Sequence, residues 1–131
     1  MIYVDTNKGG QMEQLTKNFN LSEFICHCGC GGDYINRDLV DLLQQVRDHM
    51  PMQNTMTVTS GVRCEKHNNR IGGSLTSSHI DGVAVDLKCE TGAFRQQLLR
   101  EVFKHFNRVG IAKNFIHVDI DPAKVPSVWM Y

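Results

Sequence analysis

The segment Ser77–Asp86 reads SSHIDGVAVD and ends in a run where apolar side chains alternate with others. In a β-strand from Val83 to Leu87, successive side chains point to opposite faces, so the two valines and the leucine face the core. Asp86 then lies on the opposite face. His79 precedes this strand, in the turn that leads to Gly82.

A second segment, Phe115–Ile120, reads FIHVDI and has the same alternation. If it is a strand, its two isoleucines and its valine are buried, and His117 and Asp119 lie on the other face with Phe115. The sequence therefore predicts two strands that are each apolar on one face and carry polar side chains on the other.

Three of these residues, His79, Asp86 and His117, have the composition of a catalytic zinc centre. Such a centre has three protein ligands of nitrogen and oxygen type and a fourth position for water or substrate, whereas structural zinc sites are richer in cysteine. Each residue taken alone is more often an ordinary surface or core group. Their occurrence together, at positions that face away from the apolar core, predicts a metal site.

These residues also carry a family resemblance. The pattern Ser-x-His-x-x-Gly-x-Ala-x-Asp at Ser77–Asp86, followed by His-x-Asp at His117 and Asp119, resembles that of the zinc D-alanyl-D-alanine metallopeptidases. Upstream, SGVRC at Ser60–Cys64 and the Ile-Gly-Gly that ends at Gly73 are similar to the Ser-Gly-Tyr-Arg-Cys and Val-Gly-Gly pattern of the carboxypeptidase branch.

The resemblance runs from about Asn20 to Ile120 and implies both a fold and an activity. The implied fold is the one that DD-peptidases share with the hedgehog signalling domain. The implied activity is zinc-dependent hydrolysis of amide bonds in peptidoglycan stem peptides, by a D-Ala-D-Ala carboxypeptidase or an endopeptidase. Zinc would lower the pKa of a bound water towards ~7 and polarise the scissile carbonyl.

The resemblance also implies roles for residues around the metal. Arg63 matches an arginine that binds substrate and stabilises the charged transition state, and Ser77 either hydrogen-bonds the substrate or caps its own loop. Several relatives have a general base three residues before the last ligand histidine, where this chain has Asn114. Asp119 is the alternative base. It could equally orient His117 or pair with Arg63.

The chain has five cysteines, an odd number, so they cannot all form disulfides with one another. Four of them could supply thiolates for a second, structural zinc ion: Cys26, Cys28, Cys30 and Cys64. Disulfides and inert thiols are the alternatives. Cys89 is expected to be a buried apolar residue.

Composition excludes other classes of function. With 131 residues the chain is expected to form one domain over its whole length, and we expect a monomer. Lys plus Arg equals Asp plus Glu at 14 each, which argues against nucleic acid as a partner. No apolar run reaches the ~18 residues of a membrane helix, and no secretory signal is evident at the start.

We therefore expect synthesis in the cytoplasm and action on the cell wall, as a phage-encoded or virion-associated enzyme would do. The competing hypothesis is a noncatalytic zinc-binding module for structure or recognition, such as a phage tail component. The missing carboxylate at Asn114 keeps this second hypothesis open.

The predicted elements give an α+β fold, with helices packed on a small and mainly antiparallel sheet. A short edge strand is expected at Val4 and Asp5, a capped turn at Asn20–Phe24, and an irregular tail after Pro122. The other expected elements are helices at Asn36–Met50, Cys64–Ile71 and Thr91–Phe106, and strands at Thr55–Thr59, Val83–Leu87, Val109–Ile111 and Phe115–Ile120.

Overall fold

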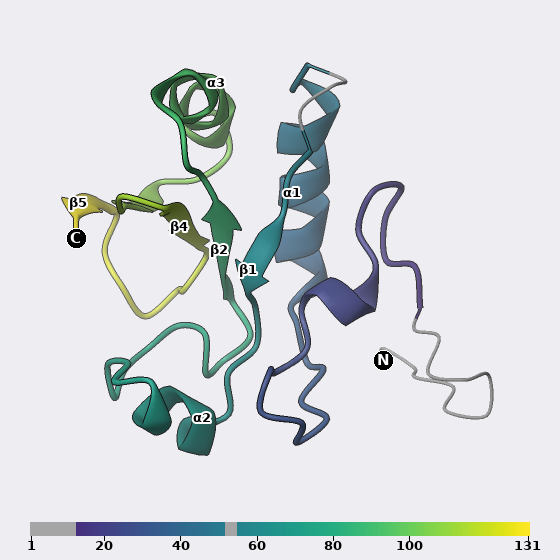
Figure 1. Ribbon diagram of the computed structural model, residues 1–131, viewed down its shortest axis with the longest axis vertical. Coiled ribbons are helices and arrows are strands. Elements are labelled where there is room, and N and C mark those ends of the chain that lie inside the picture. The colour runs from purple at the N-terminus through teal and green to yellow at the C-terminus, as the bar shows by residue number, and fades with distance from the viewer. Residues whose placement is uncertain (1–12, 52–54) are drawn as a thin grey trace.

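The computed structural model describes residues 13–51 and 55–131, so the edge strand expected at Val4 and Asp5 lies outside the described residues. Figure 1 shows helices arranged around one sheet. The helices are the 3-10 helix η2 (Leu21–Glu23) and the α-helices α1 (Arg37–Asp48), α2 (Glu65–Arg70) and α3 (Gly92–Val102). The strands are β1 (Val58–Ser60), β2 (Ala84–Lys88), β3 (Arg108–Ile111), β4 (Phe115–Asp119) and β5 (Ser127–Met130).

The five strands form one sheet in the order β1-β2-β4-β3-β5. The pairings β1–β2, β2–β4 and β3–β4 are antiparallel, and β3–β5 is parallel. The sheet is therefore mixed, and the fold class is α+β as predicted. The prediction of an irregular tail was wrong for β5. Two prolines flank the approach to this strand and hide its pattern, and its pairing partner β3 lies far from it in sequence.

Helix α1 begins where the sequence predicts it. Asn36 is the N-cap, and its side chain accepts hydrogen bonds from the backbone N–H groups of Asp38 and Leu39. The helix ends at Asp48, two residues before the predicted end. Of the apolar stripe expected at Leu39, Leu42, Leu43, Val46 and Met50, all but Leu42 are buried, and Leu42 is half-buried. Val40 is buried in addition.

Helix α3 begins at the expected cap, since the Thr91 side chain accepts a hydrogen bond from Phe94 N–H. It ends at Val102, a full turn before the predicted end. Phe103 lies within the predicted helix but beyond the observed one and is 47% exposed, whereas Phe106 is buried. The reason is that the chain leaves the helix in a turn after Val102, which directs Phe103 outward and returns Phe106 to the core.

The two faces of the sheet differ as the alternation of side chains predicts. The apolar side chains of β2 and β4 join those of α1 and α3 in one core cluster. Asp86 and His117 occupy the opposite face. The strand at β2 begins at Ala84, however, and Val83 is only half-buried because it lies in the turn before the strand.

Gly82 fixes the turn between His79 and β2. Its φ is +71°, a conformation that other residues rarely adopt, and a Cβ atom here would lie 2.3 Å from the backbone oxygen of Tyr34. The Gly82 carbonyl also accepts a hydrogen bond from Asn36 N–H at 2.9 Å. The turn that carries His79 is thereby fastened to the segment that enters α1.

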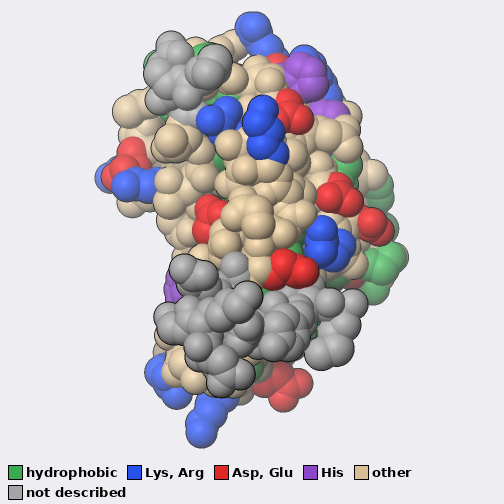
Figure 2. All heavy atoms as spheres, turned by 90° about the vertical axis from the view of Figure 1, so that its right-hand side faces the viewer, with side chains coloured by type: hydrophobic (Ala, Val, Ile, Leu, Met, Phe, Trp, Pro, Cys, Tyr) green, Lys and Arg blue, Asp and Glu red, His purple; other side chains and the backbone are tan. Residues whose placement is uncertain are grey.

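Helix α2 lies apart from α1 and α3, between the end of β1 and the loop that leads to β2 (Figure 1). Across the described part of the face in Figure 2, Lys and Arg side chains are interspersed with Asp and Glu. None of the helices in the described residues combines the length and hydrophobicity needed to span a bilayer.

Candidate metal centre

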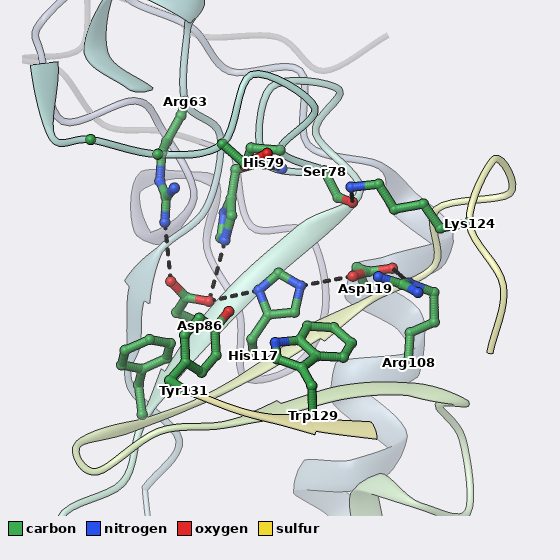
Figure 3. Close-up of a pocket in the computed structure, with 15 residues that line it drawn as sticks. Arg63, Ser78, His79, Asp86, Arg108, His117, Asp119, Lys124, Trp129 and Tyr131 are labelled. Carbon is green, nitrogen blue, oxygen red and sulfur yellow. Dashed lines mark hydrogen bonds and ion pairs between the residues drawn. The ribbon is translucent and has the colours of Figure 1, made fainter. Parts of the chain in front are cut away.

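The pairing of β2 with β4 places Asp86 directly opposite His117. Both side chains point to the face of the sheet that lies away from α1 and α3, so the strand pairing alone makes them neighbours. His79 reaches the same place from the turn before β2. Three residues that the sequence places in two separate segments therefore meet at one point (Figure 3).

The distances within this group suit a shared cation. Asp86 Oδ1 lies 3.0 Å from His117 Nδ1 and 3.2 Å from His79 Nε2. One ligand atom from each residue lies within 4.8 Å of the others, and all three side chains are buried. Two imidazole nitrogens and a carboxylate oxygen form a donor set that Zn²⁺ accepts. The residues present thus fit the ion that the sequence predicts.

In each histidine, the ring nitrogen that faces away from Asp86 makes a hydrogen bond to another part of the protein. His79 Nδ1 donates to the Gly61 carbonyl at 2.8 Å, and His117 Nε2 donates to Asp119 Oδ2 at 2.7 Å. These two bonds fix the ring orientations and leave His79 Nε2 and His117 Nδ1 facing the group. Partners of this kind are typical of metal-binding histidines.

The electrostatics agree with a cation site. Burial opposes ionisation of Asp86, but hydrogen bonds from His117 and His79 outweigh it and hold the pKa well below its ordinary value. Burial likewise lowers the pKa of His117, but hydrogen bonds to Asp119 and Asp86 outweigh this and raise it. Asp86 is therefore a carboxylate throughout the neutral range and available as a ligand.

Asp119 lies behind His117, on the side away from Asp86. Its side chain is 1% exposed. Oδ2 accepts from His117, and Oδ1 accepts from Arg108 Nε at 2.7 Å and from Asp121 N–H at 3.2 Å. Burial raises the pKa of Asp119, but these hydrogen bonds outweigh it and lower the pKa overall. Both oxygens are engaged, and the ion-pair partner is Arg108, not Arg63.

Arg63 holds the other side of Asp86. Its guanidinium donates to Asp86 Oδ2 at 3.2 Å, to Ser60 Oγ at 3.0 Å and to Asn68 Oδ1 at 3.3 Å. A guanidinium has five N–H donors, so these three contacts leave two of them for another acceptor. The buried Asn68 therefore links α2 to the arginine beside the centre.

A cavity of about 340 Å³ lies in front of the centre (Figure 3). Arg63 and His79 line one wall, and Trp129 and Tyr131 line another. Ser77 also lines the cavity, and its Oγ accepts a hydrogen bond from His79 N–H at 3.3 Å, as a loop cap does.

Asn114, in contrast, is exposed and does not line this cavity. An acidic residue at that position would not face the metal centre in this structure.

Several polar residues around the cavity are not indicated by any pattern in the sequence. Ser78 Oγ donates to Asp121 Oδ2 at 2.7 Å and accepts from Lys124 Nζ at 2.9 Å. The Arg108 guanidinium, already paired with Asp119, lies 5.0 Å from the ring centroid of Trp129. Only the strand pairing brings these residues to the centre, so no local pattern in the sequence could have identified them.

The four predicted thiol ligands also lie together, in a second group that we call the cysteine cluster: Cys26, Cys28, Cys30 and Cys64. One sulfur atom from each lies within 4.8 Å of the others. Cys89 is buried elsewhere in the core, as expected.

An α+β domain with two histidines and an aspartate converging on an open cavity has the construction of a metal-dependent hydrolase. The sequence profile of the family peptidase M15 matches residues 17–119, which include all three residues of the centre. The chain belongs to this family of zinc metallopeptidases. No curated protein matches the chain.

Proposed function

We propose that the protein cleaves amide bonds in the stem peptides of peptidoglycan, with zinc held by His79, Asp86 and His117. The observation that carries this proposal is the convergence of these three buried side chains on an open cavity. Zinc bound there would activate a water and polarise the carbonyl to be cleaved. The stem peptide as substrate rests on the family resemblance, and it would place the enzyme's action at the bacterial cell wall.

The roles of the surrounding residues follow from their contacts. The two N–H groups that Arg63 does not use within the protein suit an oxyanion that develops on the substrate. Ser77 Oγ already accepts a hydrogen bond and keeps its own proton for a substrate acceptor. We assign Asp119 to positioning His117 and not to proton transfer, because both its oxygens are engaged and its side chain is buried.

The enzyme could act as a carboxypeptidase or as an endopeptidase, and the charges in the cavity favour an endopeptidase. A carboxypeptidase needs a cation available to the free carboxylate at the end of its substrate. Here the cations that line the cavity are each paired with a carboxylate: Arg63 with Asp86, Arg108 with Asp119, and Lys124 with Asp121. The two N–H groups that Arg63 keeps free are the ones we assign to the oxyanion, which leaves none of its donors for a terminal carboxylate.

The test is mass spectrometry of purified peptidoglycan and synthetic stem peptides after digestion, with and without a chelator. We expect internal cleavage that the chelator abolishes and added zinc restores, and we expect none from a His79→Ala variant. Release of terminal D-alanine alone would assign a carboxypeptidase instead.

A noncatalytic zinc-binding module is the second candidate. One observation favours it: among the described residues that line the cavity, the only carboxylates are Asp86 and Asp119, and both are engaged. A protein that binds zinc through His79 but releases no peptide at any pH from about 5 to about 9, where a general base could act, would establish this function.

A further inference from the structure

Three sulfur atoms of the cysteine cluster form a triangle with edges close to those of a tetrahedral metal site, and the fourth, Cys30 Sγ, lies within 4.8 Å of each of them. The Sγ atoms of Cys26, Cys28 and Cys64 lie 3.4, 3.5 and 3.9 Å apart. A tetrahedral zinc site with Zn–S bonds of ~2.3 Å has S–S edges of ~3.8 Å. A disulfide would need ~2.05 Å. The spacing therefore suits four thiolates around one ion better than it suits a disulfide.

The backbone of the first loop is shaped to bring its three cysteines to one point. Gly29 and Gly31 have φ of +84° and +82°, and Cys26 N–H donates to the Gly32 carbonyl at 2.9 Å to close the loop. These tight turns let Cys26, Cys28 and Cys30, which alternate along the chain, direct their sulfurs to the same side.

Backbone amides also point at the sulfur atoms. The N–H of Cys64 donates to Cys26 Sγ at 3.5 Å, that of His67 to Cys64 Sγ at 3.3 Å, and that of Gly32 to Cys30 Sγ at 3.4 Å. Hydrogen bonds to an ionised acceptor are stronger than neutral ones, so these three donors would support sulfur atoms that bind a metal ion as thiolates.

Burial in the cluster is graded. Cys26 is buried, Cys28 and Cys64 are half-buried, and Cys30 is exposed. An inert core cysteine would be covered on all sides, as Cys89 is. The exposed Cys30 gives an ion a path into the cluster, and it can close the coordination once the ion has entered.

We propose that the cysteine cluster binds one structural zinc ion, separate from the ion of the catalytic centre. The ion displaces the thiol protons, so that all four ligands bind as thiolates and no redox step is involved. Because all four positions of a tetrahedral ion are then filled by the protein, this ion has no open site for substrate.

Such an ion would fasten the segment that carries Arg63. Cys64 follows Arg63 directly, and the ion links it to a loop 38 residues earlier in the chain. Beside this link, Val62 N–H donates to the Phe24 carbonyl at 2.8 Å, and a Cβ on Gly61 would lie 2.6 Å from the same oxygen. We therefore expect the ion to stabilise the fold and to hold the guanidinium of Arg63 at the cavity.

The test counts zinc in protein purified under reducing conditions, by elemental analysis and native mass spectrometry. We expect two ions per chain in the wild type, one for each group of ligands, and one in both Cys30→Ser and Cys28→Ser. Because Cys30 is exposed, we expect Cys30→Ser to fold as the wild type does, and circular dichroism checks the fold of both variants. Cobalt substitution should give sulfur-to-metal charge-transfer bands that are lost in the same variants.

Two matched controls complete the experiment. Cys89→Ala removes the cysteine outside the cluster and should retain both ions. His67→Gln should retain both as well, although His67 Nδ1 is buried near the cluster and has no hydrogen-bond partner among the described residues. Loss of an ion in His67→Gln with retention in Cys30→Ser would overturn the four-thiolate ligand set.

The outcome is independent of the proposed function. His79→Ala should lose the other ion and leave the cobalt–sulfur bands unchanged. The proposal that the cysteine cluster binds zinc would be wrong if the wild type bound no more zinc than the two cysteine variants. It would also be wrong if Cys26 and Cys64 formed a disulfide. Both conclusions hold whether or not the catalytic centre binds zinc.

Discussion

The hydrogen bond from His117 Nε2 to Asp119 Oδ2 decides which nitrogen of the ring faces the metal centre. His79 depends in the same way on the carbonyl of Gly61. Asp119 is itself held by Arg108, so its carboxylate has one available orientation. Asp119, which we assign to positioning, thereby sets the orientation of the metal-binding ring of His117.

Replacing Asp119 by alanine should weaken zinc binding by about 10–100-fold, because His117 loses the partner that orients its ring. Excess zinc should then restore most of the activity. Asp119→Asn keeps an oxygen that can accept the same hydrogen bond and should lose less. Zinc titration and kcat measured in parallel check both variants. If Asp119 were the general base, activity would stay lost at saturating zinc with the affinity unchanged.

For Arg63→Ala we expect the opposite behaviour. Loss of an oxyanion donor typically lowers kcat by about 10²–10³, and excess zinc cannot replace it. Steady-state kinetics at saturating zinc measure this, with Arg100→Ala on the exposed side of α3 as the matched control. Full recovery of activity with added zinc would show that Arg63 acts only by holding Asp86.

At the scale of the elements, β5 completes the cavity. It pairs in parallel with β3 and brings Trp129 opposite Gly110. The ring centroid of Trp129 lies 5.3 Å from that of His117, so the strand covers the metal centre on one side. A Cβ on Gly110 would lie 2.6 Å from Trp129 Nε1 and 2.8 Å from the ring of Tyr131.

Gly110→Ala should therefore displace both aromatic rings from the cavity. We expect a loss of about 1–3 kcal/mol in the free energy of unfolding, as for other overpacked sites, together with lower activity. Gly92→Ala is the control. A Cβ at the start of α3 meets no atom of the described residues within 4 Å, and the change should stabilise the fold by about 0.4–1 kcal/mol. Denaturant unfolding measures the free energy of unfolding of the two variants. Equal values would contradict the packing described for β5.

The elements also show what the sequence can predict. A strand with one buried face can face only one way, so alternation alone placed Asp86 and His117 on the face away from the core. Caps at Asn36 and Thr91 located two helix starts. The pairing of Arg108 with Asp119 and the position of β5 could not be predicted, because both depend on which strands become neighbours and not on any local pattern.

At the scale of the whole molecule, buried charges couple stability to pH. In the zinc-free protein the pKa of Asp86 and that of Asp119 are lowered, so their contribution to stability is present above the unfolded value of about 3.9 and is lost as pH falls through the folded values. The pKa of His117 is raised, so its contribution is present below about 6.5 and is lost as pH rises through the folded value.

The zinc-free protein should thus lose stability on both sides of a window between about pH 4 and about pH 6.5. Zinc binds the deprotonated histidine. As pH rises above about 6.5, the zinc-loaded protein should therefore become more stable while the chelated protein becomes less stable. Thermal unfolding from pH 5 to about pH 9, with chelator and with zinc, measures the two slopes. If the melting temperature changed with pH in the same way in the chelated and the zinc-loaded protein, His117 would not be a zinc ligand. In the chelated protein, His117→Gln should remove the loss of stability above about pH 6.5.

Anomalous diffraction at the zinc edge, from crystals of the zinc-loaded protein, tests whether His79, Asp86 and His117 hold the ion. We expect an anomalous peak at about 2.0–2.2 Å from His79 Nε2, His117 Nδ1 and an oxygen of Asp86, with one coordination position open to the cavity. A loaded crystal without a peak among these three residues, or with the ion held there by other atoms, would contradict this ligand assignment.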